Sequence, residues 1–158
     1  MMYFSTKYDS PLGELLIVSD GDAIFKVSFT NNDEDFIVND DLPIFNKVKK
    51  WFDDYFNGLN PKIDFKLNPE GSEFRLGVWN ILSEIPYGQS VTYGEIASMI
   101  SDNMAPQAVG GAVGANPIAI IIPCHRVLGK NGKLTGYAGG LDRKIELLKI
   151  EDIKFKMI

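Results

Sequence analysis

The first thirty residues contain three strand-like segments, and in the last of them Phe25, Val27 and Phe29 alternate with Lys26 and Ser28. Strand-like segments at 2–10, 15–19 and 23–30 are separated by two turn sequences, Ser10-Pro11-Leu12-Gly13 and Asp20-Gly21-Asp22. A two-residue period is typical of strands that bury one face, and an Asp-Gly pair is a common hairpin signal. The pattern therefore predicts a small antiparallel sheet at the start of the chain.

The pattern changes to a helical period after an acidic, loop-like segment at 31–41. From Pro43 to about residue 57, apolar side chains recur every three or four residues and form one broad face: Ile44, Phe45, Val48, Trp51, Phe52, Tyr55 and Phe56. Gly58 provides a stop signal. A face of this width is typical of a helix that packs on a core, so we assign it a structural role.

The second half of the chain predicts several short helices. One is expected at 73–84, and Thr92-Tyr93-Gly94-Glu95 is a capping-box sequence that predicts another at 93–100. Pro106 suits the first turn of the next helix. Two short helices with a tight connection favour a helix-turn-helix.

The last part of the chain is a series of loops followed by a helix. A buried apolar segment at 118–122 leads into Pro123-Cys124-His125-Arg126-Val127. Turn-forming residues at 129–137 predict a small hairpin or wing. A final helix is expected at 141–151, with Leu141 among its inward-facing side chains. We place the connection between two lobes at 61–72, which gives an α/β lobe at 1–72 and a mainly helical lobe at 73–158.

The composition is that of a chain that folds around a hydrophobic core and has no membrane-spanning helix. Of the 158 residues, 45% are apolar and 23% are charged, which excludes a disordered chain. No run approaches the ~18 apolar residues that a membrane helix needs. Met1 to Phe4 are followed by Ser5 and Lys7 instead of an apolar signal region. A single cysteine excludes an internal disulfide framework, so we expect a reducing cytoplasm.

Charge is distributed unevenly between the two halves. The net charge of −5 argues mildly against a nucleic-acid partner for the chain as a whole. Residues 1–70 hold 7 basic and 13 acidic side chains, whereas residues 71–158 hold 9 and 8. A polyanion is therefore expected to bind the second half.

The helix predicted after Pro106 is rich in small residues, with the sequence Gln107-Ala108-Val109-Gly110-Gly111-Ala112-Val113-Gly114-Ala115. Each interior glycine costs roughly 1 kcal/mol against alanine. The helix has almost none of the side chains that read bases in the major groove. Either the glycines permit tight helix packing, or the helix approaches DNA closely through its backbone with little sequence preference.

Cys124 and His125 are the only cysteine and the only histidine, and they are adjacent. Singly, each is most often a buried structural side chain, and together they are too few for a structural zinc site. As a pair they indicate a nucleophile, because an imidazole can take the proton of a nearby thiol. Side chains that follow one another in an extended segment point apart, so we expect a bridging water. An acid of the last helix could orient the imidazole, and spacing leaves Asp142, Glu146, Glu151 and Asp152 open.

The segment Pro123-Cys124-His125-Arg126-Val127, preceded by Asn116-Pro117, closely resembles the active-site signature of the O6-alkylguanine-DNA alkyltransferases. Further matches follow in consistent order across residues 73–151: Phe74 with Val78-Trp79, Ile85-Pro86-Tyr87-Gly88, Thr92-Tyr93-Gly94-Glu95-Ile96-Ala97, Ala108-Val109-Gly110, and Tyr137 with Gly139-Gly140-Leu141, Arg143-Lys144 and Leu147-Leu148. Residues 1–72 match only in general character. The resemblance implies a ribonuclease-H-like α/β lobe, followed by a winged-helix-like helical lobe that contains the helix-turn-helix.

The resemblance also implies a reaction and roles for five residues. Cys124 would accept the alkyl group from O6-alkylguanine in DNA, with O4-alkylthymine as a further candidate lesion, and each molecule would act once. His125 would be the base, acting through water, and Glu151 would be the acid that orients it. Asn116 would brace the site. Tyr93 would support base flipping and donate toward the purine ring. No cofactor or metal is implied, and we expect a monomer.

Other residues are implied to contact substrate or DNA. The carbonyls of Cys124 and Val127 would accept from the guanine amino group, and the Ala138 N–H would face O6. Double-stranded DNA would be bound through its minor groove without strong sequence preference, and the remaining predicted contacts are Gln107, Ala108, Val113, Arg126 and Tyr137. Most family members have an arginine at the position of Gln107. Glutamine lacks its charge and its planar guanidinium, so we expect weaker DNA binding or slower flipping.

Two other classes of function are weighed against this hypothesis. A lesion-binding module without transfer, like the alkyltransferase-like proteins, lacks the nucleophilic cysteine, whereas Cys124 is present. Only Gln107 favours such a module. A cysteine hydrolase could use Cys124, His125 and Glu151, but the adjacent Cys-His order and the helix-turn-helix argue against it.

Overall fold

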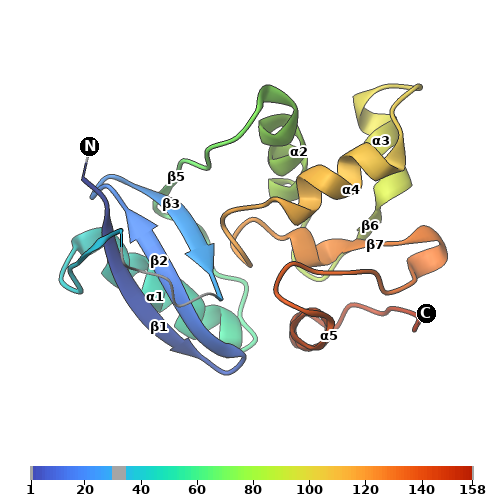
Figure 1. The fold of residues 1–158 in the computed structure, drawn as a ribbon. Helices are drawn as coiled ribbons and strands as arrows, with labels where there is room; N and C mark the ends of the chain where they lie inside the picture. The colour runs from blue at the N-terminus through green and yellow to red at the C-terminus, as the bar shows by residue number, and fades with distance from the viewer. Residues whose placement is uncertain (1, 30–34, 158) are drawn as a thin grey trace. The chain divides into compact units, whose positions relative to one another are not determined.

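The strands predicted at the start of the chain form most of a five-stranded sheet in the order β4-β1-β2-β3-β5 (Figure 1). The computed structural model describes residues 2–29 and 35–157. Three strands pair antiparallel in succession, and two short edge strands are parallel to their neighbours: β1 (Phe4–Ser10), β2 (Gly13–Ser19), β3 (Ala23–Ser28), β4 (Ile37–Val38) and β5 (Lys66–Leu67). The two predicted turns lie between β1, β2 and β3.

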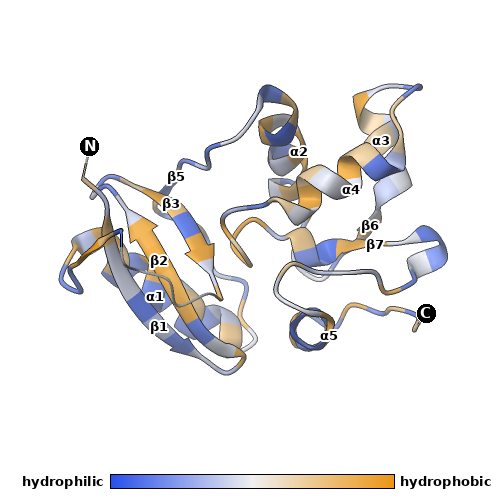
Figure 2. Ribbon diagram, in the orientation of Figure 1, coloured by the Kyte–Doolittle hydropathy of each residue, from blue (hydrophilic) through white to orange (hydrophobic). Residues whose placement is uncertain are grey.

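Two details of this sheet differ from the prediction. The strand predicted to continue to residue 30 ends at Ser28. Of the predicted loop at 31–41, residues 31–34 lie outside the described residues, and the remainder includes β4. In β2, Leu15, Leu16, Ile17 and Val18 are all buried, so this central strand is covered on both faces. Figure 2 shows the continuous apolar character of β2, which is typical of a strand buried on both faces.

The amphipathic pattern after Pro43 forms α1 (Pro43–Phe56), which packs on the sheet. Its buried residues are those of the predicted face, except for the half-buried Phe56. Phe52 stacks on Tyr8 of β1, and the Tyr8 hydroxyl donates to Asp53 at 2.6 Å. The structural role predicted for this face is confirmed.

The chain divides into two compact units, Met1–Glu70 and Gly71–Ile158, and the second contains four further helices among the described residues: α2 (Glu73–Ser83), α3 (Tyr93–Ile100), α4 (Pro106–Gly114) and α5 (Leu141–Ile150). Both halves of the capping box at the start of α3 are present, as predicted. α4 packs against α2 and α3, and the indole of Trp79 donates to the Ala112 carbonyl at 2.8 Å.

Short elements connect these helices. β6 (Val91–Thr92) pairs in parallel with β7 (Val127–Leu128). β7 follows directly after the 3-10 turn η1 (Cys124–Arg126). The segment 129–137, predicted as a hairpin or wing, contains the 3-10 turn η2 (Lys130–Gly132), and the Gly129 N–H donates to the Lys133 carbonyl. Leu141 is 40% exposed and not inward-facing, because it begins the first turn of α5. Across residues 2–29 and 35–157, no helix is both long and apolar enough for a bilayer crossing.

Candidate active site

Cys124 and His125 lie in one tight turn and not in an extended segment, which corrects the geometry expected from the sequence. Backbone hydrogen bonds close the turn, from the Cys124 N–H to the Ile122 carbonyl at 2.8 Å and from the Arg126 N–H to the Pro123 carbonyl at 3.0 Å. The preceding apolar segment is almost entirely buried and anchors the turn in the core. The premise that successive side chains alternate therefore does not hold here, since a 3-10 turn places them a third of a revolution apart.

Asn116 braces this turn from the end of α4. Its side-chain amide donates to the Ile122 carbonyl at 2.8 Å, and its side-chain oxygen accepts from the Ile118 N–H at 3.0 Å. Both ends of the amide are therefore used to fix the loop that leads to the cysteine. The same side chain also favours the thiolate form of Cys124.

Of the four acidic residues that spacing left open, Glu151 is the one that contacts His125. His125 Nε2 and Glu151 Oε2 are 2.5 Å apart, and both side chains are inaccessible to solvent. The other carboxylate oxygen accepts from Arg126 Nε at 2.7 Å and from the Gly88 N–H at 3.0 Å. Glu146, by contrast, is half exposed and faces Lys149.

Burial and charge set the protonation states of this group. Burial alone would raise the pKa of Glu151, but its contacts with His125 and Arg126 outweigh burial and lower the pKa to about 2. Burial also lowers the pKa of His125, against the opposing effect of Glu151. At neutral pH the carboxylate is thus ionised and the imidazole neutral. Nε2 then bears the hydrogen that Glu151 accepts, which leaves Nδ1 as the basic nitrogen.

Cys124 lines a cavity although it is only 6% exposed. The cavity has a volume of about 250 Å³, and its lining is Tyr93, Gly110, Val113, Gly114, Cys124, Gly136, Tyr137 and Ala138. Burial raises the pKa of the thiol, while Asn116 and Lys144 lower it. The pKa of Tyr137 lies well above its usual value because the hydroxyl is buried beside Cys124.

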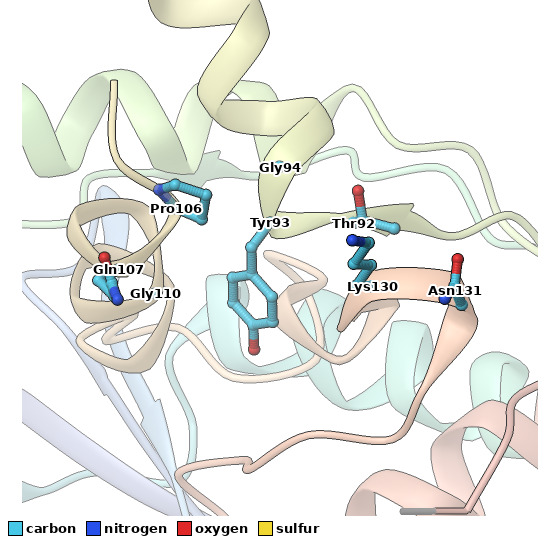
Figure 3. Close-up of a pocket in the computed structure, with 8 residues that line it drawn as sticks. All are labelled: Thr92, Tyr93, Gly94, Pro106, Gln107, Gly110, Lys130 and Asn131. Carbon is cyan, nitrogen blue, oxygen red and sulfur yellow. The ribbon is translucent and has the colours of Figure 1, made fainter. Parts of the chain in front are cut away.

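A larger groove of about 610 Å³ adjoins the cavity and shares Tyr93 and Gly110 with it. Figure 3 shows the Tyr93 ring between Gln107 of α4 and the η2 residues Lys130 and Asn131. Gln107 and Ala108 are exposed on α4.

Arg126 and Val127 lie behind the cavity and not in its lining. Arg126 is 9% exposed, holds Glu151, and donates to the Ile85 carbonyl at 2.7 Å. Val127 is fully buried, and its carbonyl accepts from Lys144 at 2.7 Å. The position of Arg126 favours support of Glu151 over contact with DNA.

Lys144 is a functional candidate to which the sequence reasoning assigned no role. It is 1% exposed, and its ammonium donates to Val127 O at 2.7 Å, Thr135 Oγ1 at 3.1 Å and Gly136 O at 3.5 Å. Burial lowers its pKa to about 8, against the opposing effect of Cys124. Its spacing from Leu147, Leu148 and Glu151 places it on the buried face of α5, which is the signal that identifies it in the sequence.

Comparison with known proteins identifies first the class and then the family. Residues 2–69 match the ribonuclease-like domain of 6-O-methylguanine DNA methyltransferases, and residues 73–153 match their DNA-binding domain. The fold is thus a ribonuclease-like α/β unit followed by a helical DNA-binding unit. Because these two matches span nearly the whole chain, the protein belongs to the 6-O-methylguanine DNA methyltransferase family.

Individual relatives agree with this assignment. The methylated-DNA–protein-cysteine methyltransferase of Haemophilus influenzae is 47% identical over 96% of this chain and 88% of its own length. The methylated-DNA–protein-cysteine methyltransferase of Methanosarcina acetivorans is also 47% identical, over 95% of this chain and 98% of its own length. The crystal structure of Mycobacterium tuberculosis O6-methylguanine methyltransferase superposes with a TM-score of 0.86 at 38% identity, covering 95% of this chain and 93% of that one. A crystal structure of the M. tuberculosis protein in complex with DNA superposes with a TM-score of 0.84 at 39% identity. The match covers 96% of this chain and 92% of that one.

Proposed function

We propose that this protein repairs O6-alkylguanine in DNA by transferring the alkyl group irreversibly to its own Cys124. The observation that carries the proposal is the position of Cys124, which lines a small cavity beside the buried pair of His125 and Glu151. We infer that this cavity, of about 250 Å³, receives one everted base.

The first step is removal of the thiol proton. In the empty site the buried thiol and the neutral imidazole are the resting forms, which keeps the sulfur weakly nucleophilic. His125 takes the proton, directly or through a water, and becomes an imidazolium. Glu151 stabilises that cation at 2.5 Å and remains ionised throughout.

The second step is displacement at the alkyl carbon. The thiolate attacks in line, so an Sγ–C bond forms while the C–O6 bond breaks, and the electron pair stays on the guanine. The Ala138 N–H donates to O6, and the Tyr93 hydroxyl donates to the purine ring. The product is a thioether. Because the carbon–sulfur bond of a thioether is stable to thiols and water, the thiol is not regenerated and each molecule acts once.

DNA is engaged through α4 in this proposal. Gln107 and Ala108 are exposed there, and the small side chains allow the helix to lie close to the sugar–phosphate backbone in the minor groove. α3 and α4 would act as the helix-turn-helix of a winged-helix-like lobe at 73–158, and the ribonuclease-H-like lobe at 1–72 would have no part in the chemistry. The target base flips into the cavity, at a cost of a few kcal/mol. We further propose a cytoplasmic monomer that also accepts O4-alkylthymine.

Intact-mass measurement tests the transfer. The protein is mixed with an excess of duplex oligonucleotide that contains one O6-methylguanine, and an unmodified duplex is the control. We expect a stable gain of one methyl group per molecule, located on Cys124 by peptide mapping and absent in Cys124→Ser. Binding without a mass change would identify a lesion-binding module. A transient acyl adduct with an ester or peptide would identify a cysteine hydrolase.

A further inference from the structure

We propose that Thr135 and Lys144 form a proton relay behind Tyr93, which resupplies the phenol when it protonates the departing guanine. The inference rests on the proposed function and extends it to two residues that do not touch the substrate. Both are positioning residues, because they act through the Tyr93 hydroxyl.

Three elements bring the relay together inside the second unit. Tyr93 is the first residue of α3, Thr135 lies in the loop between η2 and α5, and Lys144 is in the second turn of α5. The Tyr93 hydroxyl is 3.1 Å from Thr135 Oγ1, which is itself 3.1 Å from Lys144 Nζ. Tyr93 lines the cavity beside Cys124, whereas Lys144 is buried at 1% exposure. The chain of hydroxyls therefore connects the cavity to a buried cation.

The acceptors around Lys144 fix the direction of these hydrogen bonds. Two of its three partners are the carbonyls of Val127 and Gly136, which can only accept. The remaining N–H is directed at Thr135 Oγ1, so the threonine oxygen accepts from the ammonium. Thr135 then has its own hydrogen available for the Tyr93 oxygen, and the Tyr93 hydrogen is free to point into the cavity, where the purine would lie.

The protons balance as follows. When the C–O6 bond breaks, Tyr93 gives its proton to an unprotonated ring nitrogen of the purine. In the same movement Thr135 gives its proton to the Tyr93 oxygen, and Lys144 gives one to Thr135 Oγ1. Guanine leaves neutral and Lys144 becomes a neutral amine. The amine regains a proton from solvent, where the proton taken by His125 is finally released.

The charges around the relay suit this task. Lys144 faces Cys124 and His125 of η1, while Tyr93 faces Thr135 and Cys124. Burial lowers the pKa of Lys144 to about 8, so the ammonium is present at neutral pH but is a stronger acid than an exposed lysine. Burial raises the pKa of Tyr93, which makes an unassisted phenol a poorer donor.

A double-mutant cycle tests the relay in the full-length protein. Single-turnover methyl transfer at saturating DNA is measured for wild type, Thr135→Val, Tyr93→Phe and the double variant, with Thr135→Ser as the matched control that keeps the hydroxyl. General acid catalysis contributes about 10²–10⁴-fold, so we expect Thr135→Val to slow transfer at least about 10-fold without weakening DNA binding. Thr135→Ser should stay within about twofold of wild type. In the Tyr93→Phe background, Thr135→Val should have no further effect.

The pH profile gives an independent readout. The wild-type rate should decline above about pH 8 as Lys144 loses its proton. Loss of the Lys144 charge also raises the pKa of the Cys124 thiol in both proteins, so Thr135→Val should retain that part of the decline and lack the part that the relay contributes. Additive effects in the cycle, or an unchanged rate in Thr135→Val, would overturn the relay while leaving the proposed function intact. A wild-type protein that gains no methyl group would instead overturn the proposed function.

Discussion

At the scale of single residues, the Glu151 carboxylate has two tasks, because its oxygens contact different partners. Oε2 meets His125 Nε2, whereas Oε1 accepts from Arg126 and from the Gly88 N–H. In the proposed mechanism, the first contact would stabilise the imidazolium that forms when His125 takes the thiol proton. The second ties the end of α5 to the turn that follows α2.

Replacement of Glu151 by glutamine should therefore slow methyl transfer. An amide has no charge to stabilise the imidazolium, and its NH₂ group would oppose either His125 Nε2–H or Arg126. We expect a loss of about 10²-fold or more in the single-turnover rate. Glu146→Gln, a half-exposed position on the same helix, is the control and should behave as wild type. Equal rates for the two variants would contradict the role of Glu151.

Gln107 stands where the resemblance to the alkyltransferases leads us to expect an arginine. It is exposed on α4 and lines the larger groove (Figure 3). Gln107→Arg adds a charge and a planar guanidinium that can fill the gap left by a flipped base. We expect repair of lesion-containing duplex about fivefold faster, which corresponds to roughly 1 kcal/mol. Repair of single-stranded lesion DNA, where no stack needs to be opened, is the control. An arginine variant no faster on duplex would refute this role.

The sequence identifies residues whose type is rare in the chain. It does not identify residues whose role depends on where the fold places them. Cys124 and His125 stand out because each is unique in the chain. The choice of Glu151 among four acids depends on how α5 is placed against Gly88 and Arg126, which local spacing does not encode. Lys144 differs, because its spacing does place it on the apolar face of α5, but a lysine on a helix is ordinarily solvated and so attracts no functional role.

At the scale of elements, α4 combines poor helix propensity with tight packing. Val109, Ala112 and Val113 are buried, while Gly111 is exposed, and a Cβ at Gly111 would meet no atom of the protein. Nothing within the described fold therefore requires glycine at that position. A close approach to DNA is the reason that the proposed function supplies.

Gly111→Ala separates folding from DNA binding. An exposed helical alanine should raise the free energy of unfolding by up to about 1 kcal/mol. The added methyl group should at the same time weaken DNA binding if α4 lies in the groove. Gly77→Ala in α2 is the matched control, because that position is also exposed and open, and it should stabilise without affecting DNA. Denaturant unfolding and binding titrations measure the two effects. Identical DNA affinity for both variants would argue against α4 as the contacting helix.

Long periodic elements were predictable and short ones were not. The face of α1 and the capping box of α3 carry strong local signals, and both are confirmed. β6, β7 and η1 contain two or three residues each, too few for a period to show. The sequence therefore predicts an extended segment at Cys124, whereas a hydrogen bond from Asn116 helps to hold a closed turn there.

At the scale of the whole molecule, chemistry and charge are divided between the two units. Residues 1–70 have a net charge of −6 and residues 71–158 of +1, and every residue of the candidate site belongs to the second unit. The acidic unit repels a polyanion, so DNA is directed to the unit that contains Cys124. A net charge of only +1 implies that affinity depends on close fit more than on bulk attraction.

The buried ionisable groups of the second unit should make the protein sensitive to acid. The pKa of Glu151 is lowered from 4.5 to about 2 in the folded state. As pH falls through this window the unfolded chain binds a proton that the folded chain does not, so on the order of 3 kcal/mol of unfolding free energy is lost. Because burial lowers the pKa of His125 from 6.5, a further loss of the same sign begins below about pH 6.5.

Urea unfolding between about pH 7 and about pH 2 measures this loss. We expect the stability of Glu151→Gln to be lower than wild type at neutral pH but to fall less steeply with acid, because the ionisable group is gone. Glu146→Gln should follow the wild-type curve, since that carboxylate is half exposed. If Glu151→Gln and wild type lost stability in parallel, acid sensitivity would have to arise elsewhere, and the buried carboxylate would not be the group that couples protonation to the fold.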